Sequence, residues 1–139
     1  MRTKLSVMIA GFGLLLAAVP VLAHHSFAAE FDAKRPVKLQ GTVTKMEWIN
    51  PHAWIHIDVK AEDGTVTNWM IEAAAPNSLL RRGWNKNSLP AGTEILVEGF
   101  QAKDQSNRAN GSVITFTDGK KLFVGSSAGD PGAAPGAPK

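Results

Sequence analysis

The stretch from Ala53 to Lys60, AWIHIDVK, is the feature that most constrains the fold of this chain. Every second residue from Ala53 to Val59 is apolar, and the residues between them are polar or aromatic. Because successive side chains of a β-strand point to opposite faces, this alternation predicts a strand with one face in a core. The other face, which begins with Trp54, is then directed outward.

Four further segments have strand-like patterns, and a short fifth one follows them. The first of them changes parity near Thr44 to Met46, which predicts a bulge or a sharp bend. Asp63-Gly64 suits the tight turn of a hairpin. The segments are residues 37–49, 66–74, 94–102 and 112–117, with an extension at 120–124.

The segment PNSLLRRGW, residues 76–84, predicts one short helix, because Pro76 suits a first helical turn and Gly83 suits the end of a helix. The order is therefore three strands, a helix and two strands, as in the small Greek-key barrel called the OB-fold. We predict an all-β fold, a small OB-fold-like β-barrel of five strands with one short helix between strands 3 and 4. An SH3-like barrel is the alternative.

Residues 1–23 have the three parts of a secretory signal peptide. Arg2 and Lys4 give a basic start, a run of about 19 mostly apolar residues follows, and the segment ends in Val21-Leu22-Ala23. An uncleaved membrane anchor is the alternative, because such a run is long enough to span a bilayer. We expect removal of the segment, a periplasmic or secreted protein, and no membrane association after cleavage.

The remaining chain divides into three parts. We expect an N-terminal arm at residues 24–35, the barrel domain at 36–125, and a disordered tail at 126–139, which consists largely of Gly, Ala, Pro and Ser. The chain has no cysteine, so an exported domain of this sequence must rely on its packed core. About a hundred residues suffice for one core.

The charge balance argues against a nucleic-acid partner. Without residues 1–23, 13 basic residues face 12 acidic ones, whereas phosphate binding requires a concentrated basic surface. We expect instead an envelope protein, peptide or glycan as the partner.

The histidine pair His24-His25 follows the expected cleavage site directly. Cleavage after Ala23 gives His24 a free α-amine beside its imidazole, a nitrogen chelate that suits Cu(II). Cleavage after Leu22 would instead place His25 third from the amine, where amine, two backbone amides and imidazole can enclose a square-planar ion. The alternative is that cleavage exposes these histidines by chance.

The second pair, His52 and His56, lies four residues apart at the start of the alternating strand. A regular strand separates two such backbones by roughly 13 Å, so both imidazoles cannot reach one metal ion along it. One of them completes a copper site only if the N-terminal arm folds back over the strand. The plain alternative is a turn at Asn50-Pro51-His52 and a His56 that bonds to a neighbour such as Glu72. The candidate metal ligands are His24, His25, His52 and His56.

Tryptophan marks a second candidate site. Trp54 shares its strand face with His56 and Asp58, and an indole there would stack on a sugar, a base or a peptide; a simple covering role is the alternative. No nucleophile elbow of the G-x-S-x-G type occurs, and we assign no catalytic residue. The candidate groove residues are Trp54, Asp58, Met70 and Glu72.

Four stretches of the chain are similar to a known family. HHSFAAEFD, GTVTKMEWINPHAWIHIDV, DGTVTNWMIEAAAPNSLLRRGW and LPAGTEILVEGFQAKD together resemble short exported bacterial proteins of unknown function, whose mature chains begin with a similar His-His-Ser-Phe and carry an Asn-Pro-His strand entry. The resemblance covers His24 to about Phe123. It implies a small periplasmic or secreted β-barrel and no activity. The family pattern includes His24, His25, Asn50, Pro51, His52 and Trp69.

These features favour a periplasmic binding module rather than an enzyme, with copper, captured through the processed N-terminal histidine, as the expected cofactor. The first alternative is a metal-free interaction module for an envelope peptide or glycan. A copper-dependent oxidative enzyme comes third.

Overall fold

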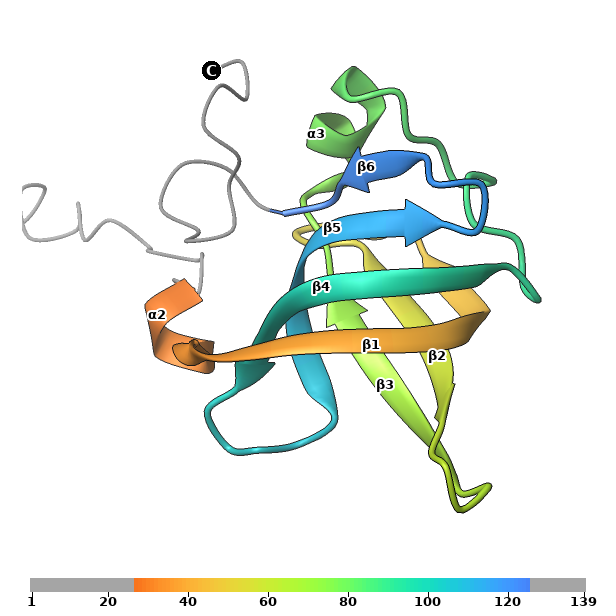
Figure 1. The fold of residues 1–139 in the computed structure, drawn as a ribbon. Helices are drawn as coiled ribbons and strands as arrows, with labels where there is room; N and C mark the ends of the chain where they lie inside the picture. The colour runs from red at the N-terminus through yellow and green to blue at the C-terminus, as the bar shows by residue number, and fades with distance from the viewer. Residues whose placement is uncertain (1–26, 126–139) are drawn as a thin grey trace, which may run out of the picture.

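The computed structural model describes residues 27–125 (Figure 1). The expected signal peptide, the pair His24-His25 and the expected tail lie outside the described residues. The elements, in chain order, are α2 (Phe27–Glu30), β1 (Phe31–Glu47), β2 (Trp54–Lys60), β3 (Val66–Glu72), α3 (Pro76–Arg81), β4 (Glu94–Ala102), β5 (Arg108–Phe116) and β6 (Lys121–Phe123).

The strands form one sheet that closes on itself. Its order is β3-β2-β1-β4-β5-β6, and neighbours in this order are antiparallel. A further parallel pairing joins β3 to β5, with Met70 opposite Arg108 and Glu72 opposite Asn110. This pairing turns the sheet into a ring, in which β1 and β4 run across β2, β3 and β5 (Figure 1). The all-β prediction is confirmed.

Strand β1 is long enough to belong to both sides of the ring. Its first part pairs with β4 and its last part with β2, and the register shifts between Val43 and Lys45. The bulge predicted at this place is therefore confirmed. The strand starts at Phe31, inside the segment expected as an arm, and a second irregularity lies between Phe31 and Pro36. Pro36 has no N–H to donate to a ladder.

The core lies inside the ring. Ala53, Ile55 and Ile57 are fully buried, as the alternation of β2 predicts, and Val59 packs against them. Trp84, which follows α3 in the chain, is 1% exposed, and α3 lies beside β6 (Figure 1). The Nε1 of Trp84 donates a hydrogen bond of 3.1 Å to the carbonyl of Phe123. Burial of these side chains is the main source of stability in a domain without disulfides.

Two glycines allow β5 to approach its neighbours. A Cβ on Gly99 would lie 2.1 Å from the carbonyl oxygen of Asn110, and one on Gly111 would lie 2.7 Å from the side chain of Ile71. Strand β5 consequently begins at Arg108, four residues before the predicted start, and it reaches β3 as well as β4. Within residues 27–125, no helix has the length and apolar character to cross a membrane.

Candidate functional site

The candidate site is a pocket of about 250 Å³ beside the parallel pairing of β3 and β5. Trp54 on β2 lies directly opposite Glu72 at the end of β3, and Arg108 begins β5. The loop that precedes β2 and the end of α2 complete the wall. The lining residues are Glu30, Phe31, Ile49, Asn50, Pro51, His52, Trp54, Glu72 and Arg108.

Glu72 is the buried carboxyl group of this pocket, with 8% of its surface exposed. Asn110, itself buried, donates a hydrogen bond of 3.2 Å from Nδ2 to Glu72 Oε1. Burial raises the pKa of Glu72, and the charge of Glu30 raises it further, whereas His52, Asn110 and Arg108 lower it. The net shift of this pKa is upward, because burial destabilises the charged carboxylate more than His52, Asn110 and Arg108 stabilise it.

His52 contacts a backbone carbonyl through one ring nitrogen. Its Nδ1 lies 3.1 Å from the carbonyl oxygen of Ala73 and 3.8 Å from Glu72 Oε1. A carbonyl oxygen only accepts hydrogen bonds, so a hydrogen bond in this contact requires the proton on Nδ1. The residue follows a cis peptide bond between Asn50 and Pro51. With Nδ1 held in this way by Ala73, Nε2 is the other ring nitrogen of a residue that lines the pocket.

Arg108 supplies the positive charge of the pocket. Its Nη2 lies 3.6 Å from Glu30 Oε2, which is longer than a hydrogen bond. Its Nε is buried and has no hydrogen-bond partner among residues 27–125. The guanidinium thus carries one buried donor, Nε, that the described residues do not satisfy.

The start of the described chain is held next to the pocket. Phe27 makes an edge-on contact with Phe100, with 5.6 Å between ring centroids, and lies 5.8 Å from the ring of Phe31. Lys103 donates from its backbone N–H to the carbonyl of Glu30 at 2.9 Å. Both Glu30 and Phe31 line the pocket. Residues five and six positions after His25 therefore border the site.

His56 lies in different surroundings from His52. Its Nε2 is 3.5 Å from Glu47 Oε1, and the hydrogen bond from Lys45 is the main cause that lowers the pKa of Glu47. The predicted contact of His56 with Glu72 is wrong, because the register places Met70 opposite His56. In the described part of the chain, no group of three or more His, Asp or Glu residues is arranged to hold a metal ion.

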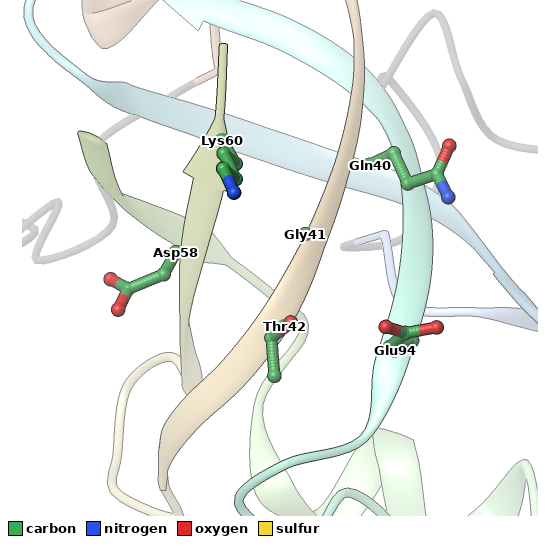
Figure 2. Close-up of a pocket in the computed structure, with 6 residues that line it drawn as sticks. All are labelled: Gln40, Gly41, Thr42, Asp58, Lys60 and Glu94. Atoms are coloured by element: carbon green, nitrogen blue, oxygen red, sulfur yellow. The ribbon is translucent and has the colours of Figure 1, made fainter. Parts of the chain in front are cut away.

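The predicted groove residues separate into two places. Trp54 and Glu72 line the pocket described above, and Met70 lies opposite Arg108 and His56 in the register. Asp58 belongs to a second, open hollow of about 320 Å³, which Figure 2 shows between β1, β2 and β4. Its other lining residues are Gln40, Gly41, Thr42, Lys60 and Glu94.

Sequence reasoning missed Arg108 and Glu30, the apolar lining residues Phe31 and Ile49, and Asn110, which bonds to Glu72. The stretch from Asp104 to Asn110 is polar and turn-like, so no apolar alternation marks Arg108 or Asn110 as strand residues. The only local signal is Gly111 directly after Asn110, because a glycine within a strand pattern often marks a close backbone approach.

The fold and the pocket define a small all-β protein with a partly apolar pocket that contains a buried carboxyl group, an imidazole and a guanidinium. The chain belongs to the family of unknown function DUF6152, whose model matches residues 12–111. No curated protein and no solved structure matches the chain significantly.

Proposed function

We propose that this protein is an exported binding module that captures Cu(II) at its processed N-terminus, with His52 as a further nitrogen ligand. The leader-like residues 1–23 support removal of that segment and a periplasmic or secreted location. A ring in which β1 pairs with β2 and β4, and β3 with β5, with α3 between β3 and β4, supports an OB-fold-like barrel.

The bond between His52 and Ala73 is the observation that carries this proposal. Histidines that bind metals almost always donate their second ring N–H to a carbonyl or a carboxylate, which fixes the ring and its tautomer. His52 Nδ1 makes such a contact with Ala73 and has the Glu72 carboxyl group nearby. Its Nε2 is then the nitrogen available to an ion.

The chain length supports a meeting of His24 with His52. Three residue steps separate His24 from Phe27, and an extended chain spans roughly 10 Å over that distance. Phe27 packs on Phe100, and the short helix that it begins ends at Glu30 in the pocket wall. His24 would supply its amine and imidazole, and His25 would replace it if cleavage occurs after Leu22. In this proposal the His-His-Ser-Phe start and the Asn-Pro-His entry form the functional part of the family pattern.

His56 has no place in this proposed copper site. Its Nε2 faces Glu47, and Lys45, which bonds to the same carboxylate, brings a positive charge that disfavours a metal cation. The arrangement supports a structural ion pair instead.

Equilibrium dialysis with Cu(II) tests the proposal. The mature protein, residues 24–139, is compared with a form that carries four glycines ahead of His24. This extension moves the amine away from His24 and also avoids a histidine at the third position. We expect much weaker binding by the extended form, and equal binding would remove the amine from the site.

The half-buried Trp54 favours one second candidate, a metal-free module for an envelope peptide or glycan. Its indole lines the pocket beside the carboxyl group of Glu72, and such a surface would stack on a ligand. Tryptophan fluorescence during titration with envelope peptides and glycans, with a chelator present, tests this alternative. A change that reaches saturation supports it, and an unchanged signal contradicts it.

A further inference from the structure

We propose that the pocket formed by Glu72, Arg108 and Trp54 binds a free α-amino acid with an apolar side chain. The ammonium group of the ligand contacts Glu72, its carboxylate contacts Arg108, and its side chain lies on the apolar wall. This inference does not depend on copper and shares only the pocket with the proposed function.

The guanidinium group of Arg108 is suited to bind an anionic group of a ligand. Its Nε is buried without a partner among the described residues, and buried donors in proteins are nearly always satisfied. The Nη2 of the same guanidinium is 3.6 Å from Glu30. A carboxylate can accept from the Nε and Nη2 edge at the same time, which is the bidentate geometry that arginine favours.

The carboxyl group of Glu72 is suited to bind a cationic group of a ligand. Its Oε1 accepts from Asn110, and among the described residues the nearest nitrogen of His52 is 3.8 Å from that oxygen. Only 8% of the surface of Glu72 is exposed, and a buried carboxylate requires a positively charged or hydrogen-bonding partner in contact with it. A primary ammonium group has the donors and the charge for this role.

The two groups have a spacing that suits one small molecule. Glu72 pairs with Asn110, and Arg108 lies two residues earlier on the same strand. The two backbones are therefore about 8 Å apart, from a strand spacing of about 4.8 Å and a rise of about 3.3 Å per residue. Because residues two apart on a strand share a face, both side chains project to the same face of the sheet, and an α-amino acid carries its ammonium and carboxylate groups on one carbon.

The apolar residues that line the pocket favour a ligand with an apolar side chain. Phe31, Ile49 and Trp54 line the same pocket, and Ile49 is 49% exposed. The volume of about 250 Å³ is below the range of about 300–1,000 Å³ usual for drug-sized ligands. A single apolar amino acid fits these features better than a longer peptide.

The test is calorimetric titration of the protein, residues 24–139, with L-leucine in the presence of EDTA. N-acetyl-L-leucine lacks the ammonium group and L-leucinamide lacks the carboxylate. We expect leucine to bind and each derivative to bind about tenfold more weakly or worse, because each lacks the partner for one charged group of the pocket. A thermal-shift screen of the other standard amino acids covers a different side-chain preference.

Variants separate this inference from the copper proposal. Glu72→Gln and Arg108→Lys should each weaken leucine binding by about tenfold, whereas Asp58→Asn at the second hollow should leave it unchanged. Melting of each variant without ligand shows that it is folded. Binding of neither leucine nor any screened amino acid would overturn the inference, as would equal binding of the two derivatives. Cu(II) capture that survives in Glu72→Gln would show that the two sites act separately.

Discussion

Phe27 packs edge-on against Phe100, with 5.6 Å between the ring centroids. This contact attaches the beginning of the described chain to β4, next to the pocket that Glu30 and Phe31 help to line. It matters for function because the proposed copper ligand His24 lies only three positions earlier in the sequence. In the proposed function, the packing of this aromatic pair would limit how far His24 can reach.

Phe100→Ala should weaken Cu(II) capture together with stability. We expect a loss of about 1–3 kcal/mol in the free energy of unfolding, less than the cost of deleting a fully buried phenylalanine, because Phe100 is only half-buried. Copper affinity should fall as well, since His24 is no longer held near His52. Urea unfolding and Cu(II) dialysis measure the two effects.

Phe116→Ala is the matched control for this change, because Phe116 is also partly buried but packs against the core of the ring. It should reduce stability and leave copper affinity unchanged. Equal copper affinity in both variants and the parent protein would show that the contact of Phe27 has no part in metal capture.

Glu72→Gln should change how stability depends on pH. The pKa of Glu72 is raised in the folded protein above its ordinary value of 4.5, so folding favours the protonated form. The contribution of Glu72 is therefore fully present below pH 4.5 and is lost as the pH rises through the raised native pKa. Each pKa unit of this shift corresponds to about 1.4 kcal/mol.

Urea unfolding of both proteins at a series of pH values measures this contribution as the difference between them. Exposed carboxyl groups such as Asp63 and Asp104, whose pKa values are lowered, act in the opposite direction but cancel in the difference. We take the difference as the unfolding free energy of the parent protein minus that of Glu72→Gln, and we expect it to fall as the pH rises. A value that stays constant or increases with pH would contradict the assignment.

The local features of the fold could be predicted because they depend on neighbouring residues. The alternation of β2, the bulge after Val43, the turn at Gly64 and the helix that begins at Pro76 all follow from short patterns. The copper ligands at His24 and His25 rest on sequence alone, because they lie outside the described residues.

The remaining features depend on pairing between distant segments. Arg108 enters the site only because β5 pairs with β3 as well as β4, and a polar stretch around it gives no alternation to predict this. The separation of His52 from His56 follows from the register of β2 against β3, which places Glu72 opposite Trp54. A shift of one residue would have placed different side chains in the pocket.

Gly99→Ala should prevent normal closure of the ring. The added Cβ would lie 2.1 Å from the carbonyl oxygen of Asn110, and the atoms that it would meet all belong to the backbone of β5, which leaves little room for adjustment. We expect a loss of more than about 3 kcal/mol, or failure to fold, which urea unfolding and near-UV circular dichroism would measure.

Gly64→Ala is the control, because its Cβ would meet no atom within 4 Å but would occupy a backbone with φ of +86°. It should cost about 1 kcal/mol. A Gly99→Ala protein as stable as Gly64→Ala would show that β4 and β5 are not as closely paired as described.

The most direct test of the account is the Cu(II) affinity of the mature protein, residues 24–139, in competition dialysis with His52→Ala and His56→Ala. We expect His52→Ala to weaken copper binding by about tenfold or more, because it removes the nitrogen that the Ala73 contact leaves available. His56→Ala, the same change at the ion pair with Glu47, should leave the affinity unchanged within about twofold, below the usual effect of losing a metal-site residue. Unchanged affinity in His52→Ala, or an equal loss in both variants, would contradict the proposed site.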